Sequence, residues 1–339
     1  MSTRFPLATL FFKHWSVEDT EDGIVIAKAS FVQDETMRWI AQPAPELVLE
    51  DRYLGDPAFS PLMQEQDTAP GKLGTDLFLQ ATARSPDGKL LPEWPVSLTV
   101  VDRLHYGFQV RGPSHWTYRR LKGWFRTSPE LVSEVPISYD LAFGGASPGS
   151  DGGMVTFENN PSGLGFATPM RLEDGSDFAA PQIGLLPEFM GTDPLAEMGV
   201  HGFGPIAKSW LPRRSDAGTF DDQWKETRHP RLPKDYSLAF WNAAPKALQF
   251  NPPLMGNEQL HVQGIAHDGP VALQLPSVTC SLRLGQGDAD ICPMVLDTLA
   301  LDLRSGSQGT YRVDMIWRAV VQSPERFETA EIIGHRLEN

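Results

Sequence analysis

The sequence predicts a mainly β protein, either an antiparallel β-sandwich or two packed β-sheets. Long irregular loops rich in Pro, Gly and aromatic residues and a short C-terminal helix complete the expected fold. Apolar and β-branched runs of strand length lie towards both ends of the chain. Between them, Pro and Gly recur too often for long regular elements. Strands and helices do not alternate, so neither a doubly wound fold nor an α/β barrel is expected.

The first part of the chain contains four candidate strands. Residues 24–32 are β-branched and apolar, and residues 75–83 follow after an irregular stretch, 47–73, that is broken by Pro and Gly. Residues 96–104 come next, and residues 105–110 form a further short candidate. These segments predict strands that are joined by turns and by one long decorated loop.

The last third of the chain gives the strongest strand signal. Residues 260–265 lead through an Asp-Gly turn into residues 271–275, which is a hairpin pattern. Three further segments alternate apolar with polar side chains: residues 278–284, 295–303 and 311–321. Strict alternation is typical of a half-buried strand with one apolar face.

One segment near the C-terminus, residues 324–337, follows a helical pattern. Ser323 fits the N-cap position, and Pro324 fits the first helical position. The apolar side chains that share one face of this predicted helix are Phe327, Ala330, Ile333 and Leu337. The sequence therefore predicts a short helical tail.

Composition limits the classes of partner. The chain has 43 acidic and 29 basic residues, which gives a net charge of -14. Binding to nucleic acid depends on Lys and Arg that neutralise phosphates, so this balance argues against a nucleic-acid partner. No apolar run approaches membrane-spanning length, and the start of the chain shows no signal-peptide pattern. We therefore expect a cytoplasmic protein without membrane insertion, whose partners are other proteins.

Cysteine and metal-ligand patterns are weak. Cys280 and Cys292 are too few for a disulfide scaffold. Two ordinary thiols are expected, although pairing across a hairpin stays open. Asp288 and Asp290 form only a fragment of a calcium loop, and the histidines lack the spacing of metal ligands. The sequence therefore predicts neither a bound metal nor a cofactor.

The rest of the chain is organised around residues 202–256. This segment holds three tryptophans and seven prolines, and its apolar residues follow neither a helical nor a strand period. Disordered linkers contain few aromatic residues, so the segment should be ordered and packed. It is either a flap that covers the sheets or a recognition surface, because long ordered loops are often functional. Composition alone favours the flap.

One group of carboxylates in this segment would suit an enzyme. Asp221, Asp222 and Glu226 lie among aromatic residues, as the acids of a glycosidase-like hydrolase do. In the alternative interpretation, Asp221 or Asp222 pairs with Arg213 or Arg214, or caps a turn. No G-x-S-x-G nucleophile motif occurs. The second interpretation is favoured, so no catalytic residue is predicted.

The same segment supplies candidates for contact with a partner protein. Arg and Trp are frequent hot-spot residues in desolvated interface patches. The candidate partner-binding residues are Trp210, Arg213, Arg214, Phe220, Asp221, Trp224 and Trp241. A carbohydrate-binding module is the other binding alternative, in which the faces of the three tryptophans stack on sugar rings.

Eight blocks of sequence occur in an order that is distinctive as a set. They are residues 27–31 (AKASF), 55–76, 138–145 (SYDLAFGG), 160–166 (NPSGLGF), 202–224, 232–245 (LPKDYSLAFWNAAP), 296–303 (LDTLALDL) and 317–321 (WRAVV). Together they resemble a bacterial family that is known as a domain of unknown function and is encoded beside VgrG and PAAR spike proteins in type VI secretion clusters. The chain departs from the usual pattern at Ser162, where a Val-like residue is expected, and at residues 246–248, where Asp-Gln is common.

The resemblance implies a cytoplasmic adaptor or chaperone without known catalytic residues. Such a protein holds a PAAR-domain protein or a PAAR-linked effector and assists its loading onto the VgrG spike. The resemblance also implies one adaptor-family domain over residues 20–321, with a possible division into β subdomains of about 1–135 and 136–321. The predicted helical tail, residues 322–339, follows it.

If the loop from Trp210 to Trp224 is a binding surface, Arg213→Glu is expected to abolish partner capture. Thermal stability should then stay nearly unchanged. A pull-down assay and a thermal melt of the same variant check this pair of outcomes. A large loss of stability would instead show that Arg213 is structural.

Overall fold

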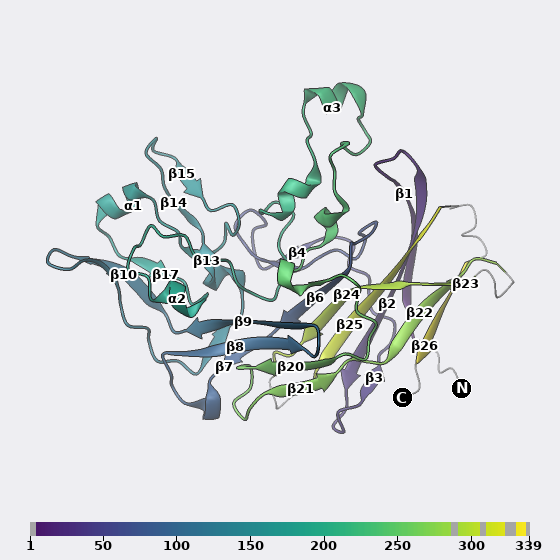
Figure 1. Cartoon of the computed structure of the whole chain (residues 1–339), viewed down its shortest axis with the longest axis horizontal. Coiled ribbons are helices and arrows are strands. Elements are labelled where there is room, and N and C mark those ends of the chain that lie inside the picture. Colours follow the sequence, from purple (N-terminus) through teal and green to yellow (C-terminus); the bar gives the residue numbers. More distant parts are fainter. Residues whose placement is uncertain (1–4, 286–290, 306–309, 323–329, 337–339) are drawn as a thin grey trace.

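The computed structural model describes residues 5–285, 291–305, 310–322 and 330–336 (Figure 1). Over these residues the protein is mainly β, with a large sheet, a second sheet and several smaller ones. The large sheet and the second sheet contribute side chains to one shared hydrophobic core. The predicted class, a mainly β protein with packed sheets and long irregular loops, is therefore confirmed.

The main sheet has seven strands among the described residues, in the order β1-β2-β25-β24-β6-β19, and β3 pairs with β2. Its strands are β1 (Ala8–Trp15), β2 (Glu21–Gln33), β3 (Trp39–Ala41), β6 (Thr75–Gln80), β19 (Gln249–Phe250), β24 (Val295–Asp302) and β25 (Arg312–Val321). Neighbouring strands are antiparallel except β24 and β6, which run parallel with Thr298 opposite Asp76. The sheet thus joins strands from both ends of the chain.

The second sheet has five described strands in the order β18-β9-β8-β20-β21. They are β8 (Glu93–Val100), β9 (Leu104–Arg111), β18 (Ile183–Gly184), β20 (Gln259–Gln263) and β21 (Val271–Gln274). The hairpin predicted over residues 260–275 is confirmed by the antiparallel pairing of β20 with β21. The strand predicted over residues 96–104 ends earlier, at Val100, because the chain turns there into β9.

Smaller elements surround the two sheets. Three-stranded sheets contain β10 (Ser114–Arg119), β11 (Gly123–Arg126) and β17 (Phe178–Ala180), and β22 (Val278–Arg283), β23 (Ile291–Pro293) and β26 (Glu331–Arg336). Two-stranded pairs are β4 (Arg52–Tyr53) with β5 (Leu62–Gln64), β7 (Thr82–Arg84) with β12 (Glu134–Pro136), β13 (Phe143–Gly144) with β16 (Leu164–Gly165), and β14 (Ala146–Pro148) with β15 (Met154–Thr156).

The α-helices are α1 (Pro169–Asp174), α2 (Leu186–Phe189) and α3 (Asp222–Thr227). The 3₁₀ helices are η1 (Pro86–Gly88), η2 (Tyr139–Leu141), η3 (Arg213–Ala217), η4 (Leu238–Trp241) and η5 (Lys246–Leu248). Within the described ranges, every helix is too short to cross a membrane.

Successive side chains along a strand of the main sheet point to its two opposite faces. On β25, Val313, Met315 and Trp317 are buried in the core shared with the second sheet. The opposite face of β25 carries Arg312, Asp314 and Ile316, and it is also covered over part of its area. We call residues 42–72 the cover segment, because its side chains line this second face together with the sheet. The main sheet is therefore packed on both sides.

The C-terminal helix predicted over residues 324–337 is wrong over Glu331–Arg336, which forms strand β26. This strand pairs with β22, and Gly334 lies opposite Cys280. A Cβ atom on Gly334 would lie 2.8 Å from the Phe5 ring, so this strand needs glycine at that position. Two consecutive isoleucines favour a strand once an edge of β22 is open for pairing. Residues 324–329 and 337 of the predicted helix lie outside the described residues.

The two cysteines are free thiols and do not form a disulfide. Cys280 on β22 is buried, and burial raises the pKa of its thiol to about 12. Cys292 on β23 is partly exposed, and its Sγ donates a hydrogen bond to the carbonyl oxygen of Leu282 at 3.6 Å. The two thiols therefore differ in their access to solvent.

We expect only Cys292 to react with Ellman's reagent in the native protein at mildly alkaline pH, because the thiolate is the reactive species. Cys280 should become reactive when urea unfolds the chain. Absorbance of the released thionitrobenzoate measures both steps, and Cys292→Ser is the control that should remove the native reaction. Rapid labelling of Cys280 in folded protein would contradict its burial.

Candidate functional site

The predicted recognition segment projects from the body of the protein. Residues 202–256 contain only short helices and the two-residue strand β19, as the sequence predicts. Figure 1 shows α3 at the tip of an extension that rises away from both sheets. We call residues 211–241 the arm. Its stem contains η3 and η4, which lie against each other.

The base of the arm is fixed inside the protein by Arg213. This side chain is 3% exposed. Its Nε donates to the carbonyl oxygen of Phe240 at 2.6 Å, its Nη1 donates to that of Ile206 at 2.7 Å, and its Nη2 pairs with Glu65. Trp210, just before the arm, is 1% exposed and packs edge-on against Tyr139. Arg213 and Trp210 therefore belong to the interior rather than to an exposed contact surface.

The middle of the arm is held in two places. Thr219 donates from its backbone N and its Oγ1 to the carboxylate of Asp235, at 3.0 and 2.7 Å, which ties the two sides of the arm together. Arg228 and Arg231 both pair with Asp19 in the β1–β2 turn, at 3.1 and 3.0 Å. Hydrogen bonding from Arg231 is the main reason that the pKa of Asp19 lies below its usual value. The arm therefore has a fixed direction relative to the main sheet.

The tip of the arm presents an aromatic pair. Asp221 caps α3 by accepting a hydrogen bond from the backbone N of Trp224 at 2.8 Å. The indole of Trp224 donates to the carbonyl oxygen of Arg231 at 2.8 Å. Phe220 is 56% exposed and lies edge-on to Trp224, with 4.7 Å between ring centres. The tip therefore offers one exposed ring on a fixed support.

The other predicted contact residues have different surroundings. Arg214 is exposed and forms an ion pair with Glu158 at 2.8 Å. Trp241 is partly buried, and the Nζ of Lys208 lies 5.0 Å from its ring centre. Of the predicted structural roles for Asp221, pairing with Arg213 or Arg214 does not occur, because these arginines pair with Glu65 and Glu158. Asp221 does act as a cap, but of helix α3 and not of the turn at Gly218 and Thr219. The structure thus groups Phe220, Asp221 and Trp224 at the tip and places the others at or below the stem.

A network of buried charges joins the arm to the main sheet. Its cations are Lys28, Lys72, Arg213 and Arg318, and its anions are Glu65, Asp67, Asp76 and Asp297. All eight side chains are at most 4% exposed. The four positive and four negative charges balance, which is the condition under which charges are tolerated in a protein interior. We call this set the charge network.

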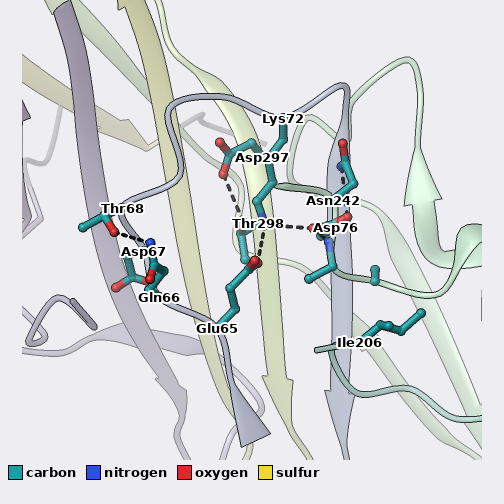
Figure 2. Close-up of polar contacts among 12 residues, drawn as sticks. Glu65, Gln66, Asp67, Thr68, Lys72, Asp76, Ile206, Asn242, Asp297 and Thr298 are labelled. Atoms are coloured by element: carbon teal, nitrogen blue, oxygen red, sulfur yellow. Dashed lines mark hydrogen bonds and ion pairs between the residues drawn. The ribbon is translucent and has the colours of Figure 1, made fainter. Parts of the chain in front are cut away.

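The contacts of the network connect three parts of the chain. Lys72 of the cover segment lies between Glu65 and Asp76, at 3.1 and 2.8 Å (Figure 2). Asp76 on β6 also accepts hydrogen bonds from the side chain of Asn242, at 3.1 Å, and from the backbone N of residue 243, at 2.8 Å. Glu65 binds both Lys72 and Arg213. A single carboxylate therefore links the cover segment to the base of the arm.

Burial and neighbouring charges shift the pKa values of two groups of the network, Lys72 and Asp297. Burial lowers the pKa of Lys72, but the carboxylates of Asp76, Glu65 and Asp297 outweigh it, so the pKa lies above its usual value. Burial raises the pKa of Asp297, and Arg318 and Lys72 offset only part of this effect. Lys72 is therefore held in its charged form by the carboxylates around it.

Next to the charge network lies a cavity of about 850 Å³. Its floor is the covered face of β2, β25, β24 and β6, and the cover segment forms one wall. Sequence reasoning missed this cavity, because the alternation in residues 311–321 predicts a polar side that faces solvent. The available signal is Arg318 and Lys28, which are charged residues at the centre of strongly apolar strands and are both buried. The described residues hold no cluster of three or more potential metal ligands. Asp288 and Asp290 lie outside the described residues.

The fold and the site define a β-sheet protein with a fixed projecting arm and a charge-lined cavity. The chain belongs to a family described as an uncharacterized protein conserved in bacteria (DUF2169), whose model matches residues 18–318. No curated protein and no solved structure matches the chain. The cavity floor, the cover segment and the whole arm lie within the matched residues.

Arg213→Ala is expected to lower the free energy of unfolding by about 3–5 kcal/mol, because it leaves Glu65 with an uncompensated share of buried charge. Urea denaturation followed by tryptophan fluorescence measures this change. Arg214→Ala is the matched control, since it removes an exposed ion pair worth about 0–1 kcal/mol.

Equal stability of the Arg213→Ala and Arg214→Ala variants would contradict the structural role of Arg213. The burial of Arg213 also changes the outcome expected for Arg213→Glu. That substitution places a second carboxylate beside Glu65, so a large loss of stability is now expected with it.

Proposed function

We propose that this protein is a non-enzymatic adaptor or chaperone that binds a partner protein through the arm. The observation that supports this proposal is the exposed Phe220 ring on an arm that is anchored at its base, middle and tip. An exposed aromatic side chain on a rigid support resembles the anchor residues of protein interfaces. Pre-organisation lowers the conformational entropy that is lost on binding.

The identity of the partner is proposed from the sequence resemblance described above. The partner is a PAAR-domain protein or a PAAR-linked type VI secretion effector, and the adaptor assists its loading onto the VgrG spike. This role places the protein in the cytoplasm, where the effector is held before secretion. The acidic composition suits a transient complex, because polar contacts are weakened by salt and competition.

The hydrolase and sugar-binding alternatives have less support. Asp221 serves as a helix cap, and Asp222 and Glu226 are exposed on α3. Among the described residues that line the cavity, these three carboxylates are absent. For sugar stacking, Trp210 is buried in the core and Lys208 lies against the ring of Trp241. A protein without turnover on glycan panels, and without a tryptophan fluorescence change on titration with sugars, would remove both alternatives.

We expect co-expression with a PAAR-containing protein from the same genome to give a stable complex. Pull-down followed by size-exclusion chromatography measures the complex and its stoichiometry. The PAAR-containing protein should be less soluble when it is expressed alone, because the adaptor covers a surface that is otherwise exposed. Two separate and independently stable peaks would contradict the proposed function.

Phe220→Ala is expected to weaken this complex by about tenfold or more, because hot-spot aromatic residues contribute about 2 kcal/mol or more. Phe59→Ala is the matched control, since Phe59 is 68% exposed in the turn between β4 and β5 and belongs to the cover segment instead of the arm. Both variants should keep the melting temperature of the wild type. Equal loss of binding in the two variants would argue against the arm as the contact surface.

A further inference from the structure

The floor of the cavity is a line of side chains that crosses four strands. Strand register places Ser30 of β2 opposite Asp314 of β25, Asp314 opposite Ala300 of β24, and Ala300 opposite Phe78 of β6. Adjacent strands lie about 4.8 Å apart, so this line is about 14 Å long. An extended peptide rises about 3.3 Å per residue, and roughly four of its residues would span the floor.

Most charged side chains around this floor are already paired within the protein. Among the described residues, only Glu46 and Arg52 of the lining form no ion pair, and their two charges are of opposite sign. Part of the lining is the charge network, whose cations and anions balance and which contributes Lys28, Glu65, Asp67, Lys72 and Arg318. Elsewhere in the lining, Arg312 donates to Asp314 at 3.0 Å and Arg304 donates to Asp302 at 2.9 Å. A strongly charged ligand would have to compete with these pairs. The lining therefore favours an uncharged occupant.

Apolar side chains and amides make up much of the remaining surface. Phe78 and Leu62 are buried at the floor and roof, while Leu54 and Met63 are 56% and 41% exposed. Four glutamines also line the cavity: Gln42, Gln64, Gln66 and Gln80. A side-chain amide offers both donors and an acceptor, which are the groups that pair with a peptide main chain.

Each of these amides has bonding capacity left. In the described parts of the chain, Gln42, Gln66 and Gln80 use only their Nε2 as donors, and Gln64 uses only its Oε1 as an acceptor. Carbohydrate sites usually present an open aromatic face, but Phe78 is only 8% exposed and the lining residues include no Trp. Amides beside apolar pockets fit alternating main-chain and side-chain contacts better.

We propose that this cavity binds an extended, uncharged peptide segment of a partner protein. Its apolar side chains pack on the exposed Met63 and Leu54, and its main chain bonds to the glutamine amides. A volume of about 850 Å³ lies within the usual range of ligand sites. The proposal needs no type VI protein, so it stands or falls independently of the proposed function.

Selection from a phage-displayed library of random dodecamer peptides on the purified full-length protein tests this inference. We expect enrichment of sequences that lack charged residues over about four consecutive positions. A selected peptide should bind Ala300→Phe protein at least roughly tenfold more weakly by fluorescence anisotropy, because the added ring occupies the cavity floor. Val320→Phe is the matched control, since Val320 lies on the same sheet but does not line the cavity.

A second variant separates cavity filling from misfolding. Gln80→Leu removes an amide at the floor without adding bulk, and it should weaken the same peptide while the melting temperature stays unchanged. The inference is overturned if no peptide is enriched on the wild-type protein relative to the Ala300→Phe protein. It is likewise overturned if the enriched peptides are strongly charged. It is also overturned if binding depends on Phe220 of the arm and not on Ala300 or Gln80.

Discussion

Eight buried charges determine how the arm and the cover segment sit on the main sheet. Lys28 and Arg318 come from sheet strands, Glu65 and Asp67 from the cover segment, and Arg213 from the arm. Removing such groups from water costs several kcal/mol per ion, and this cost is offset only while each charge keeps its partner. A small displacement of either segment would leave an unpaired charge in the interior. Their placement is therefore close to all-or-none.

The network explains stiffness better than it explains stability. Well-packed apolar residues of the same volume would often stabilise a fold as well as buried ion pairs do. Charge pairs require a particular geometry, which apolar contacts do not. Glu65 imposes this geometry on the arm and on the cover segment together, because it pairs with both Arg213 and Lys72. The base of the arm and the cover segment consequently keep a fixed relation to each other.

Local signals in the sequence predict the strands but not the site. The alternation in residues 278–284 and 311–321 is a local pattern, and both strands are present. The pairing of Glu65 with Arg213 joins residues 148 positions apart, which no periodicity reveals. Trp and Arg are frequent in interface hot spots, but the same residue types also serve as buried structural anchors. Trp210 and Arg213 are of the second kind. The C-terminal helix prediction failed over Glu331–Arg336 because its helical pattern is local, whereas the pairing of β26 with β22 depends on tertiary contacts.

The topology of the main sheet also constrains the order in which the protein can fold. Strand β2 is synthesised early, but its neighbour β25 begins only at Arg312. Ser30 therefore lacks its cross-strand partner on β25 until Asp314 has been synthesised. The hydrophobic face of β2 and its open edge are therefore without their final partners until almost the whole chain has left the ribosome. Such long-range pairing slows folding and exposes unpaired strand edges to aggregation. The edge of β2 is therefore open to association with other chains until β25 has been synthesised.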